Sequence, residues 1–335
     1  MQEAELLRHI SRRSAGLSAA FGQVVVGPGD DCAVVRIGEP SANAPPDLLL
    51  LTVDQLVEGR HFAPGTPIDQ IARKAVARSI SDIAAMGGTP KWGLATGALP
   101  AGYRHADDLF DAMADWAKRF GAPLVGGDIA ALPGSGSNTE QTQAAMVLTV
   151  TVGGTPHASR GAVLRSGARA GDEIWVTGRI GDSLPSGRHL TFEPRVAEGA
   201  WLCTVLGERL HAMIDLSDGL GRDAGRVAQT SDVRVVIDGA AVPLHAGAKG
   251  VESASADGED YELLFACAPG AMESALSRAD RPRTPLTRIG LVEAGAGCEL
   301  LLPGGLRIDV SGHGWDHSPE GATMPRAGTH VPDRR

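Results

Sequence analysis

The spacing of apolar residues predicts strands alternating with helices in the first half of the chain. Val24-Val25-Val26 is a β-branched run followed by glycine, a pattern typical of a strand. Residues 68–86 instead repeat apolar positions at helical spacing, and Gly87-Gly88 ends this segment as a C-cap would. The first half is therefore predicted to contain strands at 24–26, 32–37, 48–54, 124–128 and 144–152 and helices at 68–86 and 107–120.

The second half shows the same mixture of periodicities. Gly153-Gly154-Thr155-Pro156 is the best candidate for the boundary between two domains, at 1–153 and 154–317. Residues 318–335 lack periodicity and are expected to form a flexible tail. The second half is predicted to contain strands at 173–177, 211–214, 233–238, 261–266 and 287–292, helices at 195–210, 218–227, 246–252 and 271–279, and a hairpin joining 299–302 to 306–310. Each half is thus a mixed α/β (α+β) unit.

Composition narrows the class of protein. With 31 basic and 40 acidic side chains the chain carries a net charge of −9, which disfavours nucleic acid as a general partner. The four cysteines form no C-x-x-C or His/Cys spacing, so we expect reduced thiols and no structural zinc. Residues 1–16 lack the apolar core of a signal peptide, and the longest apolar run, around 48–51, is too short to span a membrane. We therefore expect a cytoplasmic protein without a membrane partner.

The stretch MIDLSDGLG, residues 213–221, concentrates polar side chains at the end of a predicted strand. Asp215 and Ser217 alternate with apolar residues and share one strand face, and Asp218 stands where the chain turns into a helix. Two carboxylates this close repel each other unless a cation lies between them or one binds a proton. Alternatively, Asp218 only caps the helix N-terminus, which aspartate does well, but that leaves Asp215 unexplained.

Further carboxylates lie at the ends of other predicted elements, most of them beside glycine. They are Asp30 and Asp31, Asp54, Asp82, Asp128, and those of the loop Asp257-Gly258-Glu259-Asp260. Glycine lets backbone N–H groups approach an anion, and clustered carboxylates bind hard divalent cations, so the set suggests a site for a metal–polyphosphate complex. For Asp82 two plainer roles stay open, a solvated surface carboxylate or an ion-pair ladder with Lys74 and Arg78.

Seven motifs in order resemble those of the thiamine-monophosphate kinase family, whose superfamily includes aminoimidazole ribonucleotide synthetase, selenophosphate synthetase and a hydrogenase maturation factor. The motifs are GPGDDCAVV (27–35), LTVDQLVEGRHF (51–62), ARSISDIAAMGGTP (77–90), LVGGD (124–128), VLRSGARAGDEIWVTG (163–178), MIDLSDGL (213–220) and ADGEDYELLF (256–265). Each is modest alone, but their common order is specific, and VDQLVEGRHF with GEDYELLF favours the kinase over its relatives.

The resemblance implies a thiamine-phosphate kinase that uses ATP to convert thiamine monophosphate to thiamine diphosphate by direct phosphoryl transfer, assisted by several Mg²⁺ ions. It implies the two-domain aminoimidazole ribonucleotide synthetase-like fold. The N-terminal domain would form a homodimer through its sheet, and the C-terminal domain would close over the nucleotide. The Walker signature G-x-x-x-x-G-K-[ST] does not occur in the sequence, so a P-loop kinase is not expected.

Carried over position by position, the resemblance assigns three sets of residues. The metal ligands would be Asp31, Thr52, Val53, Asp54, Asp82, Asp128, Asp215 and Asp218, with Asp54, Asp128, Asp215 and Asp218 also catalytic. The residues facing ATP would be Gly127, Asp128, Arg165 and Ser217, and those facing thiamine monophosphate would be His61, Glu259 and Trp315. Val53 stands where the family often has a hydroxyl residue, so only its backbone carbonyl could bind a metal.

The chemistry of the three acceptor residues leaves choices open. Glu259 would attract the thiazolium of thiamine monophosphate or accept a hydrogen bond from its amino group. His61 would donate to the phosphate or be a surface or capping histidine. Trp315 would stack on a flat ring or cation, or pack as a C-terminal anchor.

The link at 184–193 departs from the family, which usually has a long helix before Pro194-Arg195. Two other functions therefore stay open: ATP-dependent activation of a different acceptor, and a non-catalytic metal–nucleotide sensor. ADP release measured with and without thiamine monophosphate separates the three.

Overall fold

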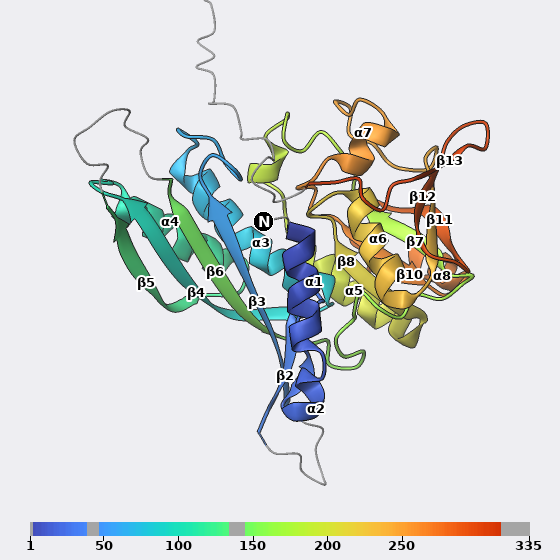
Figure 1. Cartoon of the computed structure of the whole chain (residues 1–335), viewed down its shortest axis with the longest axis horizontal. Helices are drawn as coiled ribbons and strands as arrows, with labels where there is room; N and C mark the ends of the chain where they lie inside the picture. Colours follow the sequence, from blue (N-terminus) through green and yellow to red (C-terminus); the bar gives the residue numbers. More distant parts are fainter. Residues whose placement is uncertain (1–2, 39–46, 134–144, 316–335) are drawn as a thin grey trace, which may run out of the picture.

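The computed structural model describes residues 3–38, 47–133 and 145–315, and it contains two β-sheets with the helix α3 (Ile68–Ala85) between them (Figure 1). The tail predicted at 318–335 lies outside the described residues. The two sheets confirm the predicted mixed α/β fold class. Within the described residues, no helix has both the length and the apolar character needed to cross a membrane.

The first sheet has six strands and takes up the N-terminal half of the chain. In spatial order they are β1 (Val24–Val26), β2 (Ala33–Ile37), β3 (Asp47–Val57), β6 (Val147–Thr155), β4 (Thr89–Pro100) and β5 (Leu124–Leu132). Only the pair β4–β5 is parallel. Helices α3 and α4 (Ala106–Arg119) pack on one face, where Leu50 and Val150 meet Ile80 and Ile83 in a buried core. Helices α1 (Glu3–Ser14) and α2 (Leu17–Ala20) precede this sheet.

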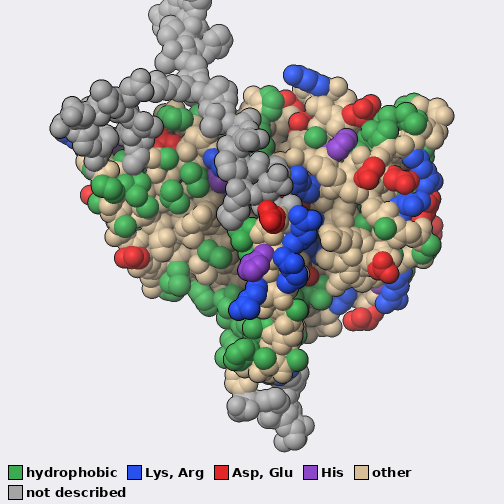
Figure 2. Space-filling model, in the orientation of Figure 1, with side chains coloured by type: hydrophobic (Ala, Val, Ile, Leu, Met, Phe, Trp, Pro, Cys, Tyr) green, Lys and Arg blue, Asp and Glu red, His purple; other side chains and the backbone are tan. Residues whose placement is uncertain are grey.

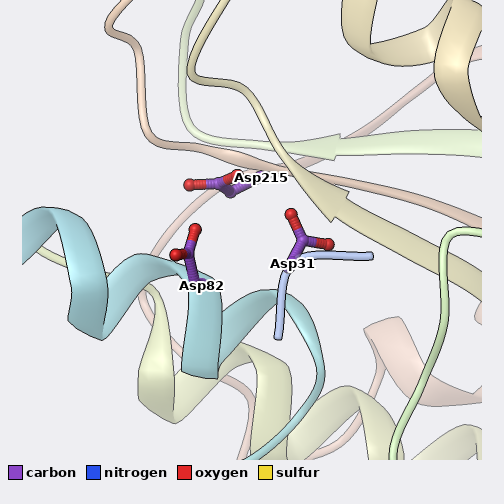
Figure 3. A group of neighbouring side chains, drawn as sticks. All are labelled: Asp31, Asp82 and Asp215. Carbon is purple, nitrogen blue, oxygen red and sulfur yellow. The ribbon is translucent and has the colours of Figure 1, made fainter. Parts of the chain in front are cut away.

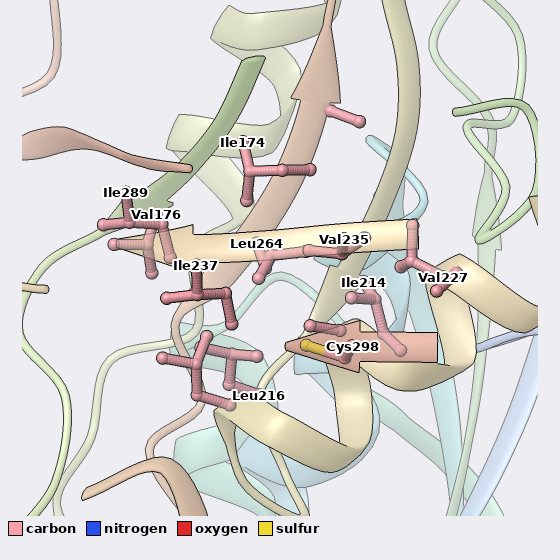
Figure 4. Packing of buried hydrophobic residues seen from close by; sticks show 14 of the residues in the cluster. Ile174, Val176, Ile214, Leu216, Val227, Val235, Ile237, Leu264, Ile289 and Cys298 are labelled. Atoms are coloured by element: carbon pink, nitrogen blue, oxygen red, sulfur yellow. The ribbon is translucent and has the colours of Figure 1, made fainter. Parts of the chain in front are cut away.

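The second sheet has seven strands. In spatial order they are β13 (Arg307–Asp309), β12 (Gly297–Leu301), β9 (Arg234–Asp238), β11 (Leu286–Glu293), β7 (Glu173–Thr177), β10 (Leu263–Cys267) and β8 (Leu210–Asp215). Helices α6 (Leu220–Ser231) and α7 (Val251–Ala256) belong to one core, in which Ile214, Val235 and Leu264 pack together (Figure 4). Helices α5 (Val196–Leu206) and α8 (Ala271–Leu276) belong to a second core around Phe265.

The two halves meet where α3 contacts α5 and β8. Glycine makes this approach possible, because a Cβ at Gly199 would lie 2.5 Å from the Ala84 carbonyl oxygen. A Cβ at Gly87, whose φ of +67° already favours glycine, would lie 2.2 Å from the Cys203 Sγ. Gly87 therefore serves both as the predicted end of the helix and as a contact between the halves.

Several sequence predictions differ from the structure. Strand β4 was not predicted, because its residues TPKWGLATGALP show no clean alternation, and its pairing with both β5 and β6 defines it. The predicted helix at 246–252 is wrong, because residues 246–250 are not helical and the helix of this region, α7, spans Val251–Ala256. The predicted helix at 195–210 ends at Leu206, and the chain enters β8 at Leu210. All four cysteines are free and buried, as expected.

Candidate active site

Three carboxylates converge between the two halves of the molecule. Asp31 comes from the turn before β2, Asp82 from α3 and Asp215 from the end of β8, and Figure 3 shows them pointing toward one another. Each offers an oxygen, and these atoms all lie within 4.8 Å of one another. Asp31 and Asp215 are buried, with 7% and 2% of their surface exposed. Sequence segments more than 180 residues apart, from 31 to 215, thus supply one acidic group.

Hydrogen bonds at two adjacent residues of α3, Ser81 and Asp82, hold two of these carboxylates in place. The Ser81 Oγ donates a 2.6 Å hydrogen bond to the Asp215 Oδ2, and the Thr52 hydroxyl donates to the Asp82 Oδ2. One turn of α3 is therefore bonded to β8 in one half and to β3 in the other. Neither plainer role considered for Asp82 is realised, because it joins this group while Lys74 and Arg78 pair with other carboxylates.

Burial and mutual repulsion disfavour the charged forms of the carboxylates in this acidic group. Burial, and then the neighbouring Asp54 and Asp215, raise the pKa of Asp82 well above its usual value. Burial and then Asp31 do the same for the pKa of Asp215. Burial and the Asp31 charge raise the pKa of Asp30 to about 6. A bound proton or cation would relieve this repulsion.

Arg165 offsets part of this negative charge. Its guanidinium donates a 2.6 Å hydrogen bond to the Asp31 Oδ1, and its backbone N–H lies 3.2 Å from the Asp30 Oδ2. The Asp31 Oδ2 is buried and has no hydrogen-bond partner among the described residues. A buried carboxylate oxygen without a donor is costly, and a bound cation would satisfy it. The donor set, all hard oxygen atoms, suits Mg²⁺.

Asp54 and Val53 lie beside this group on β3, on opposite sides of the strand. Arg78 lies 3.3 Å from the Asp54 Oδ1 and also donates to the Gln55 carbonyl oxygen at 2.6 Å. The Val53 side chain is on the other face of the sheet, with 61% of the residue exposed. Only the backbone of Val53 is left for a metal, as the sequence predicts.

Asp218 does not cap α6. The Asp223 Oδ2 instead accepts hydrogen bonds from the backbone N–H groups of Asp218 and Gly219, at 2.9 and 3.1 Å. Arg226 pairs with both carboxylates, lying 2.6 Å from Asp218 and 2.7 Å from Asp223. The N-cap residue is Gly219, without a side-chain cap, so the alternative of a simple N-cap at Asp218 is wrong. The Asp218 carboxylate is instead held by its ion pair with Arg226. The carbonyl oxygen of Ser217 accepts a 2.7 Å bond from the Glu259 N–H.

Gly127 and Asp128 lie on the edge strand β5, outside the group of three carboxylates. They pair in register with Ala95 and Thr96 of β4, and both are exposed. A Cβ at Gly127 would lie 1.8 Å from the Ala95 carbonyl oxygen, so this position requires glycine.

Trp315, His61 and Glu259 lie near the junction of the halves. The Trp315 N–H donates a 2.8 Å bond to the Asp218 carbonyl oxygen, and the Arg60 guanidinium lies 5.7 Å from the centre of the Trp315 ring. His61 is buried, and its Nδ1 accepts a 2.9 Å bond from the Val57 N–H. The His61 imidazole is therefore a fixed, buried group, and its role as a surface histidine is wrong.

Sequence reasoning missed the residues that hold Glu259. Lys74 is fully buried on α3 and forms an ion pair with Glu259, with His189 beside them. A signal was present, since Lys74 falls on the buried side of the helix at 68–86, where a lysine needs a partner.

A further contact fixes the short link at 184–193, which contains one turn of 3₁₀-helix, η1 (Arg188–Leu190). Arg73 on α3 donates to the carbonyl oxygens of Thr191 and Phe192, at 2.8 and 2.5 Å. Phe192 stacks on Tyr261 with ring centres 3.9 Å apart. The link of the second half is thus bound to a helix of the first.

This architecture is the AIR synthase-like fold. Residues 29–155 match the family described as "AIR synthase related protein, N-terminal domain". Two hydrogenase maturation protein HypE structures, 20% and 21% identical with TM-scores of 0.62 and 0.63, share the fold.

Closer relatives are thiamine-monophosphate kinases. The one from Rhodopirellula baltica is 33% identical over 290 residues, covering 83% of this chain and 86% of its own, and that from Escherichia coli is 31% identical over 325 residues, covering 88% and 92%. The solved structure "AaThiL complexed with AMPPCP and TMP" is 27% identical, has a TM-score of 0.74, and covers 95% of this chain and 97% of its own. The chain belongs to the thiamine-monophosphate kinase family and is an enzyme of that kind.

Proposed function

We propose that this enzyme transfers the γ-phosphoryl group of ATP to the phosphate of thiamine monophosphate, forming thiamine diphosphate and ADP. An acceptor phosphate oxygen forms the new P–O bond, and the bond from the γ-phosphorus to the bridging oxygen breaks, so that the electron pair leaves with ADP. The acceptor is already an anion and needs little help from a general base. The observation that carries the proposal is the acidic group of Asp31, Asp82 and Asp215 between the halves, in a chain similar to a structure titled with AMPPCP and TMP.

The chain's own residues would bind and orient the two anions. Asp31, Asp82 and Asp215 would hold Mg²⁺, with Thr52, the Val53 carbonyl, Asp54, Asp128 and Asp218 completing several metal sites. Mg²⁺ bound there would supply positive charge against the repulsion of triphosphate and acceptor phosphate. Gly127, Asp128, Arg165 and Ser217 would face ATP, and His61, Glu259 and Trp315 would face thiamine monophosphate.

Arg165 has a particular part in this arrangement. Its guanidinium donates to Asp31 and its backbone N–H donates to Asp30. Arg165 therefore lies at the edge of the acidic group, where its positive charge would face a phosphate of ATP. The turn at Asp30-Asp31 and the start of the second half are thereby joined. Alignment of donor and acceptor depends on both halves.

The N-terminal sheet would also form a homodimer. Its face away from α3 exposes Val53 and Leu94, at 61% and 38%. Figure 2 shows hydrophobic side chains gathered over this sheet. Contiguous exposed apolar surface of this kind marks an interface. Replacing Val53 and Leu94 by glutamate should turn a dimer into a monomer in sedimentation velocity, and an unchanged sedimentation coefficient would contradict this interface.

The experiment that tests the function is release of ADP in Mg²⁺ with and without thiamine monophosphate. We expect ADP only when the acceptor is present, together with an equal amount of thiamine diphosphate. ADP formed only with another acceptor would favour a different activation reaction, and ATP binding without turnover would favour a sensor. A cytoplasmic location fits a reaction that needs ATP.

A further inference from the structure

A buried cluster links α3 to the loop that carries Glu259. The Lys74 side chain is fully buried. Its Nζ donates a 2.7 Å hydrogen bond to the His61 carbonyl oxygen, lies 2.8 Å from the His189 Nδ1, and forms an ion pair with the Glu259 Oε2. One ammonium group therefore contacts three segments, including both His61 and Glu259.

The protonation of this cluster follows from its geometry. An ammonium group only donates, so the His189 Nδ1 must accept, and His189 is neutral with its proton on Nε2. Burial lowers the pKa of His189, which agrees with a neutral imidazole. Burial lowers the pKa of Lys74 to about 8 against the attraction of Glu259, so the ammonium persists at neutral pH. Burial alone would raise the pKa of Glu259, but the charge of Lys74 outweighs it and holds this pKa below its usual range.

The charges of the cluster therefore cancel. Lys74 contributes one positive charge, Glu259 one negative charge and His189 none. Arg78, a further cation whose charge acts on Glu259, pairs with Asp54. A cationic ligand that approached Glu259 would meet a carboxylate whose charge is already neutralised at contact distance.

The Glu259 carboxylate is also held firmly in place. The residue has a φ of +67°, its N–H donates to the Ser217 carbonyl oxygen at 2.7 Å, and its own carbonyl oxygen accepts a 2.5 Å bond from the Ser183 Oγ. The contacts with Lys74 and His189 both involve Oε2, and 12% of the side chain is exposed. Oε1 takes part in neither of these contacts, which leaves it to accept a hydrogen bond from a ligand.

We propose that Glu259 recognises the acceptor by a hydrogen bond from its neutral aminopyrimidine and not by the charge of its thiazolium, and that Lys74 is the positioning residue that cancels this charge and orients Oε1. The inference rests on the proposed function and decides between the two roles that Glu259 has from sequence. An acceptor oxygen placed for an amino group rejects an analogue without that donor, because the oxygen is then left unpaired. Lys74 acts through Glu259 and does not touch the substrate.

Two analogues separate the roles in the unmodified enzyme. Oxythiamine monophosphate has an oxo group in place of the amino group, and deazathiamine monophosphate has a neutral ring in place of the thiazolium. We expect kcat/KM to fall by roughly 10²-fold or more with the oxo analogue and by less than about 10-fold with the neutral ring. The reverse order, or equal losses, would overturn the proposal.

A double-mutant cycle tests the part of Lys74. Lys74→Met and Glu259→Gln each leave one buried charge unpaired, so each should raise KM for thiamine monophosphate and lower the melting temperature, with KM for ATP nearly unchanged. The double variant keeps an amide oxygen at Oε1 without buried charge, and it should recover most of both losses. Additive losses would contradict the proposal. Lys118→Met, at an exposed lysine on α4, is the matched control.

The outcomes keep the two proposals apart. An unmodified enzyme that transfers nothing to thiamine monophosphate overturns the proposed function. An enzyme that does transfer, but rejects the neutral-ring analogue more strongly than the oxo analogue, overturns only the role given to Glu259 and Lys74. Should a single variant fail to fold, the analogue series on the unmodified enzyme still decides.

Discussion

Replacing Asp82 by asparagine should stabilise the metal-free enzyme while abolishing its activity. Asparagine has nearly the shape of aspartate, and its amide oxygen can still accept the hydrogen bond from the Thr52 hydroxyl. What the substitution removes is one of three negative charges whose oxygen atoms lie within 4.8 Å of one another. A site selected only for stability would lose stability on this change, whereas a cation site without its cation should gain it.

The size of the effect follows from Coulomb's law. Two unit charges 4.8 Å apart repel by about 3.5 kcal/mol at an effective dielectric constant of ~20. Part of this is already relieved, because the raised pKa values of Asp82 and Asp215 mean that the group binds protons. We therefore expect a gain of about 1–3 kcal/mol, which corresponds to a rise in Tm of roughly 2–10 °C.

The pH dependence gives a second signature. The folded-state pKa of Asp82 lies above its unfolded value of 3.8, so the folded protein holds this proton more tightly. The stability from that proton is fully present below the unfolded pKa and is lost as pH rises through the folded pKa. The advantage of Asp82→Asn over the unmodified enzyme should therefore widen as pH increases from about 5 to about 8.

The assay is a thermal melt in chelator and then in Mg²⁺, with kinase activity measured alongside. Mg²⁺ should raise the Tm of the unmodified enzyme and have much less effect on Asp82→Asn. Asp111→Asn, at an exposed position on α4, makes the same chemical change and should leave both quantities nearly unchanged. If Asp82→Asn melts below the unmodified enzyme in chelator and keeps its activity in Mg²⁺, the acidic group is structural and the reasoning fails.

Three further variants probe the contacts around this group. Arg165→Ala removes a guanidinium from Asp31 and should weaken binding of a non-hydrolysable ATP analogue about 10-fold or more, with thiamine monophosphate binding barely changed; calorimetric titration that shows equal ATP affinity would count against it. Trp315→Ala should raise KM for thiamine monophosphate several-fold with KM for ATP unchanged, and an early melt with both constants raised would identify a packing residue. Arg73→Met releases the carbonyl oxygens of the 184–193 link and should lower stability by about 2–4 kcal/mol and open the link to proteolysis, so a link that stays resistant would refute its anchoring by Arg73.

The sequence was most informative where function and local pattern coincide. Asp31, Asp82 and Asp215 each lie at the end or turn of an element whose periodicity is readable, so both the elements and their acidic ends could be predicted. Their convergence depends on how two sheets pack against α3, which no local pattern contains. The resemblance to a family supplied that step, and the geometry now supports it.

Other features could not be predicted because long-range contacts alone define them. The pairing of Lys74 with His189 and Glu259 joins three segments distant in sequence. A cap at Asp218 was one alternative from its position, but Asp223, one turn into the helix, reaches back to the N–H groups of Asp218 and Gly219. Strand β4 likewise exists because two neighbours pair with it.

The central claim is that carboxylates from both halves hold the cation on which transfer to thiamine monophosphate depends. The most direct measurement follows label from ATP labelled in its γ-phosphate, across a titration of Mg²⁺, in the unmodified enzyme and in Asp215→Asn. The account predicts Mg²⁺-dependent label in thiamine diphosphate for the unmodified enzyme and almost none for the variant, although Ser81 can still donate to the asparagine oxygen. Label that appears only in inorganic phosphate, or a variant that matches the unmodified enzyme at every Mg²⁺ concentration, would contradict it.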